Sequence, residues 1–318
     1  MKRFLSISLI GLLLSSIGCD DVLEEDISDD SITIIAPLDQ TALEGNTVQF
    51  RWNPLEGADD YRIQITGEQQ FLVLDSLVST SVFDYQIDPG TYRWRVRGEN
   101  FAYTTPYTFE ATFSIAASLD LSGQQIALTG PADNVYFNET GISFSWKAIT
   151  TADSYVFQLL EQENATETLV FEDDNVTGTS LTLSNTTITE DAEYLWQVKG
   201  VNVSSETAFS SRSFFIDREN PPAPVLATPS NDESFNVNDM VDFTWNFTDT
   251  GEIQSSITST IEISSDEDFT VITSSDTNSD GEFSSTFTMA DTYYWRVRGE
   301  DAAGNTGQYS VTGSFIVN

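Results

Sequence analysis

A tryptophan-bearing pattern recurs three times along the chain and accounts for all six tryptophans. The distance from Trp52 to Trp146 is 94 residues, and from Trp146 to Trp245 it is 99 residues. A repeat of this length matches a small sandwich domain and is far longer than a solenoid or propeller repeat. The sequence therefore predicts three similar domains. Each copy has a Phe-x-Trp motif followed by a Tyr-x-Trp-x-Val-x-Gly motif, at Phe50-Trp52 and Tyr92–Gly98, Phe144-Trp146 and Tyr194–Gly200, and Phe243-Trp245 and Tyr293–Gly299.

Apolar residues within each copy alternate with a period of two, which turns one face of a strand inward and the other to water. Turn-forming pairs such as Pro89-Gly90 and Gly304-Asn305 separate these runs, and no sustained run has a helical period. We expect an all-β chain with seven short strands per domain in two packed antiparallel sheets. The alternating runs include 48–52, 61–65, 155–159, 261–263 and 109–115, the last of which places Phe109 on the inward face.

The repeated segments resemble fibronectin type III domains. The run from Trp52 to Ile63 (WNPLEGADDYRI) is similar to their B-to-C segment, and 91–97 (TYRWRVR) to their F strand with its corner tyrosine. The run 301–306 (DAAGNT) is similar to an F–G turn of bacterial Ig-like and type III modules. Ser259 departs from the pattern, because the other copies have tyrosine there. The resemblance implies three tandem fibronectin type III-like (Ig-like) β-sandwiches at 31–116, 125–217 and 221–318, joined by linkers at 117–124 and 221–224.

The N-terminus carries an export signal. Residues 1–18 combine Lys2 and Arg3 with an apolar run from Phe4 to Leu14 that is too short for a bilayer span. Cys19, the one cysteine of the chain, stands at the expected cleavage point after Gly18, and this end resembles the lipobox of bacterial lipoproteins. The resemblance implies lipidation of Cys19. The alternative is an ordinary secretory signal with a chance cysteine.

Seven acidic residues lie among the eleven residues that follow Cys19. Such a run repels itself, so residues 19–30 are expected to form an extended tether. Acidic residues at this position resemble the lipoprotein export signal of Bacteroidetes, which implies an outer-membrane, lipid-anchored protein facing the cell exterior. A merely solvated linker is the alternative.

The charge and the missing residue types exclude several functions. The formal net charge is -37, which repels phosphate backbones, so no nucleic-acid partner is expected. The chain has no histidine, and lipidation would consume its one thiol, so Ser-His, Cys-His and zinc arrangements are missing. The 50 acidic residues form pairs by chance, but no pair stands out as a glycosidase pair. We expect a protein that is not an enzyme.

One metal candidate lies in the third copy. Asp276, Asn278 and Asp280 supply oxygen atoms at alternate positions before Gly281, as in calcium loops. The twelfth position of this loop is Phe287 rather than glutamate, so a full EF-hand loop is excluded. Calcium is therefore the only cofactor that the sequence suggests, and a polar β-turn without metal is the alternative.

The candidate ligand-binding residues are aromatic. Stacking on sugar rings requires exposed aromatic side chains, and the six tryptophans are expected in the cores because their positions repeat. Phe101, Tyr103 and Tyr107 lie in a segment whose counterparts in the other copies are expected to have no comparable aromatic residues. Because loops at the end of a sandwich do not pack into the core, this group is a candidate binding site. Coverage of a sheet edge is the alternative.

These observations favour a non-catalytic surface lipoprotein that captures or presents extracellular polysaccharide as an accessory of a polysaccharide-utilisation system. The opening pattern is also similar to the N-terminal domains of surface glycan-binding lipoproteins of starch-type systems. The expected partners are a polysaccharide or a surface transport complex, and the outer membrane through the lipid anchor. The alternative is an adhesin or spacer that contacts other proteins.

Overall fold

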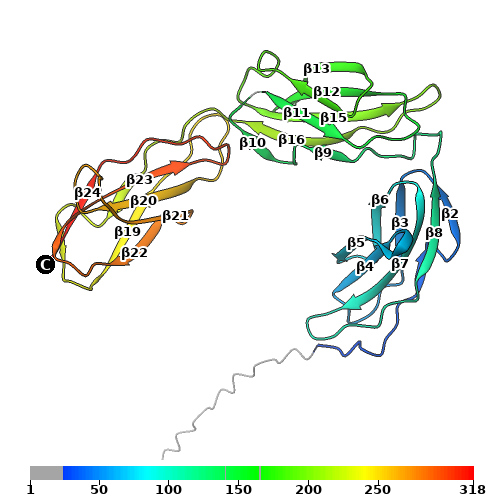
Figure 1. Cartoon of the computed structure of the whole chain (residues 1–318), viewed down its shortest axis with the longest axis horizontal. Coiled ribbons are helices and arrows are strands. Elements are labelled where there is room, and N and C mark those ends of the chain that lie inside the picture. The colour runs from blue at the N-terminus through cyan, green and yellow to red at the C-terminus, as the bar shows by residue number, and fades with distance from the viewer. Residues whose placement is uncertain (1–23, 140, 165) are drawn as a thin grey trace, which may run out of the picture. The chain divides into compact units, whose positions relative to one another are not determined.

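The computed structural model describes residues 24–139, 141–164 and 166–318, and strands make up its regular structure apart from one short 3-10 turn, η1 (Glu68–Gln70) (Figure 1). Each of the three repeats forms a β-sandwich of one three-stranded and one five-stranded sheet. The predicted all-β fold of tandem sandwiches is thus confirmed. Among the residues described, no helix is long and apolar enough to cross a membrane.

The first domain has the strand orders β1-β3-β6 and β2-β8-β7-β4-β5 in its two sheets. Strands β4 and β7 lie side by side at the centre of the five-stranded sheet, so their outward residues share one surface. The strands are β1 (Ile34–Ala36), β2 (Thr41–Glu44), β3 (Thr47–Trp52), β4 (Asp60–Thr66), β5 (Leu72–Val78), β6 (Val82–Gln86), β7 (Gly90–Glu99) and β8 (Ala111–Ala116).

The second and third domains repeat this arrangement. Their sheets have the orders β9-β11-β14 and β10-β16-β15-β12-β13, and β17-β19-β22 and β18-β24-β23-β20-β21. The second domain comprises β9 (Leu128–Gly130), β10 (Val135–Phe137), β11 (Ile142–Trp146), β12 (Ser154–Glu163), β13 (Thr166–Val176), β14 (Ser180–Leu183), β15 (Glu193–Val201) and β16 (Ser210–Ile216). The third comprises β17 (Val225–Thr228), β18 (Glu233–Phe235), β19 (Met240–Asn246), β20 (Thr258–Ser264), β21 (Ile272–Asn278), β22 (Glu282–Thr286), β23 (Asp291–Glu300) and β24 (Gly313–Val317).

The prediction of seven antiparallel strands per domain is wrong, because the first strand is divided in two. Pro37, Pro131 and Pro229 follow the first strand of each domain directly. Proline has no backbone N–H and cannot continue a ladder, so the chain leaves the smaller sheet there. The second strand joins the larger sheet, and in the second and third domains it pairs in parallel with the last strand, β10 with β16 and β18 with β24.

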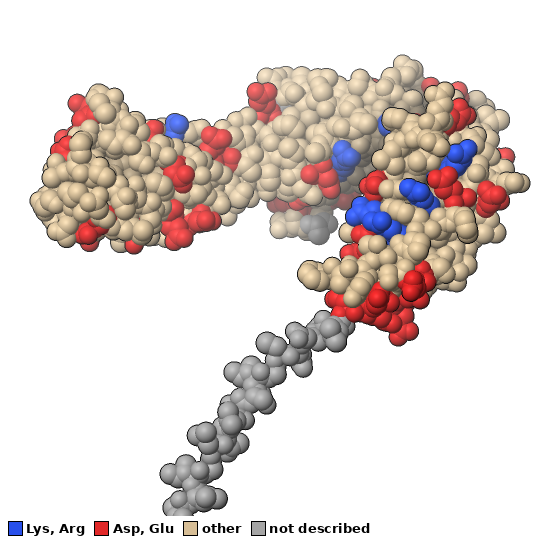
Figure 2. All heavy atoms as spheres, turned by 60° about the horizontal axis from the view of Figure 1, so that its bottom comes forward, with Lys and Arg blue, Asp and Glu red and all other residues tan. Residues whose placement is uncertain are grey.

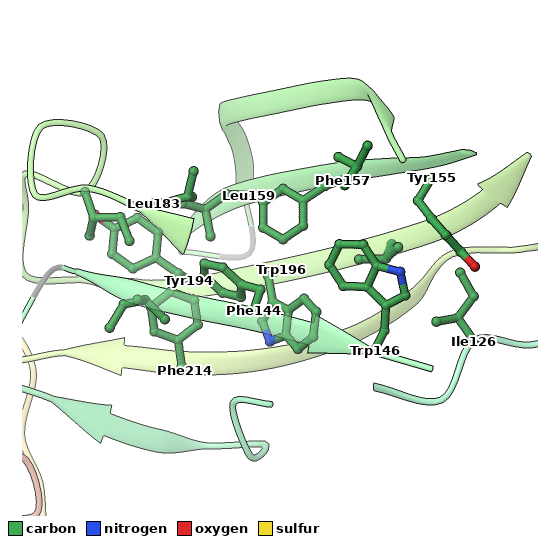
Figure 3. Packing of buried hydrophobic residues seen from close by; sticks show 14 of the residues in the cluster. Ile126, Phe144, Trp146, Tyr155, Phe157, Leu159, Leu183, Tyr194, Trp196 and Phe214 are labelled. Carbon is green, nitrogen blue, oxygen red and sulfur yellow. The ribbon is translucent and has the colours of Figure 1, made fainter. Parts of the chain in front are cut away.

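The repeated tryptophans lie in the domain cores, as predicted, and all six are almost fully buried. In the second domain, Phe144 packs its ring against Trp196 at 5.1 Å and Phe214 at 5.7 Å between centroids (Figure 3). Burying one large apolar side chain contributes about 1.5–3 kcal/mol, so such clusters supply much of the stability of each domain. The period-two alternation is therefore the main local cause of the fold.

A tyrosine corner, which the resemblance implies at Tyr92, forms in the second and third domains. The Tyr194 hydroxyl donates to the carbonyl oxygen of Glu190 at 3.1 Å, and Tyr293 donates to Met289 at 3.2 Å. Burial raises the pKa of Tyr194 to about 12, so the hydroxyl keeps its proton at any physiological pH. These bonds fasten the chain just before β15 and β23 to the strands themselves.

The segments before the domains are docked rather than free. Ile27 is fully buried and the carbonyl of Glu25 accepts a hydrogen bond from Asn100 at 2.8 Å. The expectation of an extended tether is therefore wrong for its described part, 24–30, because an apolar residue within the acidic run packs onto the domain. The predicted linkers behave similarly, since Leu121 and Pro221 are buried.

Candidate functional site

The loop between β7 and β8 presents the first candidate ring to solvent. The side-chain oxygen of Asn100 accepts hydrogen bonds from the backbone amides of Ala102 (3.1 Å) and Tyr103 (2.8 Å), which fixes a tight turn. Phe101, within this turn, is 92% exposed, and Tyr103 is 37% exposed. An exposed phenyl ring on a loop that is held by its own hydrogen bonds is suited to contact a ligand or partner.

Tyr107 has a different environment. Its ring lies against the guanidinium groups of Arg95 (4.4 Å) and Arg97 (4.7 Å), and burial raises the pKa of its hydroxyl. The expectation that the other copies lack a comparable residue is wrong for this position. Phe209 lies over Lys199 in the second domain, and Tyr309 lies over Arg296 and Arg298 in the third. A cation–aromatic pair on the outward face of the large sheet is thus a repeated structural feature.

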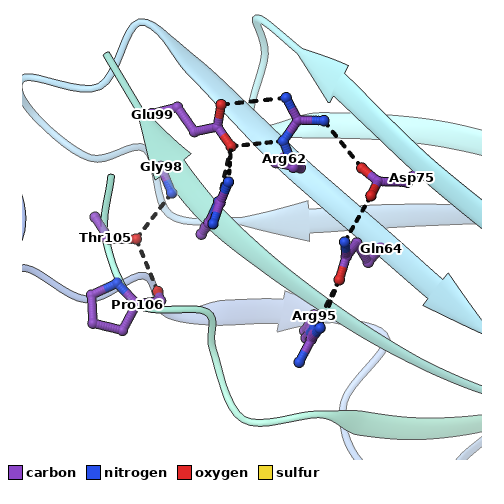
Figure 4. Close-up of polar contacts among 9 residues, drawn as sticks. Arg62, Gln64, Asp75, Arg95, Gly98, Glu99, Thr105 and Pro106 are labelled. Carbon is purple, nitrogen blue, oxygen red and sulfur yellow. Dashed lines mark hydrogen bonds and ion pairs between the residues drawn. The ribbon is translucent and has the colours of Figure 1, made fainter. Parts of the chain in front are cut away.

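Charged residues form a ladder across the outward face of the first domain. Arg62 on β4 pairs with Glu99 on β7 at 2.7 Å and with Asp75 on β5 at 3.1 Å (Figure 4). Arg95 donates to the side-chain oxygen of Gln64, whose amide donates in turn to Asp75. Figure 2 shows Lys and Arg side chains gathered on one face of this domain, with Asp and Glu side chains beside them. In a chain of net charge -37, this is a local concentration of basic side chains among acidic ones.

Hydrogen bonds across this ladder hold both carboxyl groups ionised. The bond from Gln64, followed by that from Arg62, lowers the pKa of Asp75. Burial alone would raise the pKa of Glu99, but hydrogen bonds from Arg62 and Arg97 outweigh it and lower the pKa. The face is therefore a fixed set of paired charges beside Tyr107.

Phe109 is an aromatic residue that the alternation pattern misplaced. It was expected on the inward face of a strand, but β8 begins only at Ala111, and Phe109 is 98% exposed. The irregular segment before β8 breaks the period-two pattern that the sequence suggests. Phe109 therefore joins Phe101 as an exposed ring of the segment between β7 and β8.

The predicted calcium loop forms the turn between β21 and β22. The side-chain oxygen of Asn278 accepts from the amides of Asp280 (3.2 Å) and Gly281 (3.3 Å), and its NH₂ group donates to Asp276 at 3.0 Å. These bonds are those of a polar β-turn and occupy the amide oxygen that calcium would need. Calcium at Asp276, Asn278 and Asp280 stays a prediction, as does lipidation of Cys19, which lies outside the described residues.

A different group of acids can hold a metal ion. Asp217 follows β16, Asp249 lies between β19 and β20, and Asp301 follows β23. One carboxylate oxygen from each lies within 4.8 Å of the others, and all three residues are buried. Sequence reasoning missed this group because its members lie far apart in the chain. The available signal was Asp301 in the DAAGNT turn, where the first two copies have Asn100 and Asn202.

This chain of three tandem β-sandwiches is similar to solved structures of fibronectin type III domains. The FN1–FN3 domains of chicken CNTN1 match with a TM-score of 0.42 and 13% identity, over 91% of this chain and 98% of that one.

Two further matches cover less of this chain. The fibronectin(III)-like modules of Clostridium thermocellum CbhA match with a TM-score of 0.38 and 12% identity, over 61% of this chain and 94% of that one. The two-domain segment of chicken tenascin matches with a TM-score of 0.22 and 16% identity, over 57% and 96%. No protein-family model and no curated protein matches the sequence.

Proposed function

We propose that this chain is a non-catalytic surface lipoprotein of the outer membrane that captures or presents extracellular polysaccharide through its first domain. The observation that carries the proposal is the exposed ring of Phe101 on the hydrogen-bonded turn around Asn100. Sugar rings present apolar C–H faces that stack on aromatic rings, and a preformed loop reduces the entropy lost on binding. Tandem sandwich domains suit such a role because they carry exposed loops on a rigid scaffold.

The proposed location at the outer membrane is supported by the sequence at the N-terminus. An export signal ends at Cys19, and seven acids follow it within eleven residues. Acylation of this cysteine by more than one chain would anchor the protein firmly, since a single acyl chain gives only marginal binding. The non-catalytic role is supported by the lack of histidine in the chain.

A second candidate function is an adhesin or spacer that contacts another protein, such as a surface transport complex. It is favoured by the identity of the two most exposed rings of the loop segment, Phe101 and Phe109. Phenylalanine has no hydroxyl or N–H group to bond a sugar hydroxyl, and buried aromatic anchors dominate many protein interfaces.

Affinity electrophoresis of the soluble fragment 20–318, which lacks the lipidated cysteine, against a panel of algal and plant polysaccharides tests the proposal. We expect at least one polysaccharide to retard the protein, and the retardation to be lost when Phe101 and Tyr103 are both replaced by alanine. Phe71→Ala is the matched control, because Phe71 is also a strongly exposed phenylalanine of the first domain. It should leave retardation unchanged.

Two outcomes would contradict glycan capture. Migration unaffected by every polysaccharide would favour the adhesin or spacer role, and equal loss in Phe71→Ala would show a nonspecific apolar effect. Far-ultraviolet circular dichroism of each variant verifies that the sandwiches remain folded.

A further inference from the structure

We propose that Asp217, Asp249 and Asp301 bind a calcium ion where the segment leaving the second domain enters the third. The inference is independent of the proposed glycan or protein ligand.

The spacing of the oxygens fits one ion. One oxygen from each carboxylate lies within 4.8 Å of the other two. Calcium takes oxygen ligands at about 2.3–2.6 Å, so two ligands of one ion are separated by at most about twice that distance. A single calcium ion can therefore reach all three carboxylates.

One buried carboxylate oxygen of Asp217 has no donor or cation beside it in the part of the chain that the structure describes. Asp217 is 1% exposed, and its Oδ1 accepts a hydrogen bond from the amide of Glu219 at 3.1 Å. Within the described chain, Oδ2 has no hydrogen-bond partner. Burying a carboxylate oxygen without a donor or cation carries a large desolvation free energy. A cation at this position would offset that free energy.

No side chain of the described residues neutralises the group. None of the seven ion pairs found between residues 24 and 318, outside 140 and 165, involves Asp217, Asp249 or Asp301. Arg218, the nearest cation in sequence, pairs instead with Asp191 and donates to the carbonyl of Thr189. Three facing carboxylates thus share no counter-charge.

The first two domains show what occupies this place when no cation is needed. Asn100 donates from its NH₂ group to the carbonyls of Glu25 (2.8 Å) and Gly57 (2.8 Å). Asn202 donates in the same way to Leu119 (2.9 Å) and Thr151 (3.1 Å). Each asparagine therefore ties the entering segment to the loop after the third strand of its domain.

In the third domain, aspartate replaces this asparagine. Asp301 stands two residues after Gly299, as Asn100 and Asn202 stand after Gly98 and Gly200. A carboxylate cannot donate, and Asp301 instead accepts from the backbone amide of Asn305 (2.8 Å) and from its side-chain amide (2.8 Å).

The other two acids come from the same elements that the asparagines join. Asp217 belongs to the entering segment, and Asp249 lies in a loop of eleven residues, 247–257, where the first domain has seven, 53–59. A cation between the three carboxylates would thus replace the hydrogen bond that the asparagines donate to the loop after the third strand. The bond to the entering segment is donated here by the side-chain amide of Asn305, to the carbonyl of Asp217 at 2.9 Å.

The ligand chemistry selects calcium. The group offers only carboxylate oxygens, with no nitrogen or sulfur, which excludes the usual zinc and copper sites. Calcium accepts irregular oxygen shells and fills them with carbonyls and water, whereas magnesium requires near-ideal octahedral geometry. Asp217 already joins two parts of the chain, because its backbone amide donates to the carbonyl of Phe137 in β10 and its carbonyl accepts from the side-chain amide of Asn305. An ion on its carboxylate would add a third link that fastens the entering segment.

Calorimetric titration of chelator-treated mature chain with CaCl₂ tests the site. We expect saturable binding, a higher midpoint of thermal unfolding, and slower tryptic cleavage after Arg218 when calcium is present. Asp301→Asn, which installs the residue of the other two domains, should abolish the saturable heat and the protection. Asp268→Asn is the matched control, since it removes an exposed acid of the same domain, and it should bind as the unaltered chain does. Asp280→Asn tests the predicted calcium loop between β21 and β22 separately.

A second measurement separates loss of binding from loss of folding. Without metal, Asp301→Asn should unfold at a higher temperature than the unaltered chain, because it removes one of three repelling carboxylates and restores a donor. The proposal would be overturned by no saturable heat up to about 10 mM calcium, well above the ~10⁻³ M of the weakest extracellular modules. It would also be overturned if Asp301→Asn bound calcium with unchanged affinity, or if only Asp280→Asn lost the binding.

Discussion

At the scale of single residues, Ser259 shows how one departure from the repeat is compensated. Tyr61 and Tyr155 occupy the corresponding positions, and their hydroxyls accept from the amides of Leu55 and Ile149, both at 2.9 Å. Ser259 cannot reach that loop, which is longer in the third domain. Its hydroxyl instead accepts from Nε1 of Trp245 at 2.9 Å and is fully buried. The departure that the sequence displays is thus a local exchange of hydrogen bonds.

Replacing Ser259 with alanine should destabilise the third domain by about 1–3 kcal/mol, because the buried N–H of Trp245 loses its acceptor. Urea unfolding followed by tryptophan fluorescence measures the change. Thr260→Ala on the same strand is the control, since the hydroxyl of Thr260 bonds to Thr277 on the exposed side. Equal stability of Ser259→Ala and the unaltered chain would show that the Trp245 N–H needs no partner.

At the scale of elements, the ladder across β5, β4 and β7 couples neighbouring strands of the first domain through Arg62. The pKa values of Asp75 and Glu99 are both lower in the folded protein than in free side chains. Their contribution to stability is therefore complete above the ordinary carboxyl range and is lost as the pH falls through the folded-state pKa values.

Replacing Arg62 with methionine should cost about 1 kcal/mol at pH 7, since partly exposed ion pairs contribute little and a network somewhat more. The difference from the unaltered chain should shrink at about pH 3, where the carboxyls take up protons. Urea unfolding at both pH values measures it. Arg93→Met serves as the control, because Arg93 is exposed on the same strand β7. A pH-independent difference would mean that Arg62 acts through packing alone.

At the scale of the whole molecule, the N-terminus and the charge set the conditions in which the domains work. The formal net charge of -37 produces strong self-repulsion, which keeps the protein soluble and favours cation uptake. The proposed lipid on Cys19 would hold three sandwich domains at a membrane, whichever ligand they bind.

Replacing Cys19 with alanine should move the protein from the membrane to the soluble fraction of the cell, because its proposed anchor is the acyl chains. Immunoblotting of fractions measures the change, and Arg3→Lys, which keeps the basic start of the signal and the thiol, is the control. A protein that stays in the membrane without Cys19 would have another anchor. Protease treatment of intact cells shows whether the domains face outward, as the acidic run suggests.

The sequence by itself determined the number of domains, their class and the burial of all six tryptophans. These follow from a repeat and from period-two alternation, which are local properties of the chain. It also indicated the loop of Phe101 as a candidate site, whose role in binding stays a prediction.

The tertiary structure alone decided three other features. The first strand of each domain changes sheet, because the partner of its second half is the last strand of the domain. Tyr107 is held by Arg95 and Arg97, and the corresponding contacts of Phe209 and Tyr309 with cations follow from their shared place on the sheet. Asp217, Asp249 and Asp301 meet because three distant loops converge at one end of a sandwich. Such convergence depends on long-range strand pairing, which no local pattern encodes.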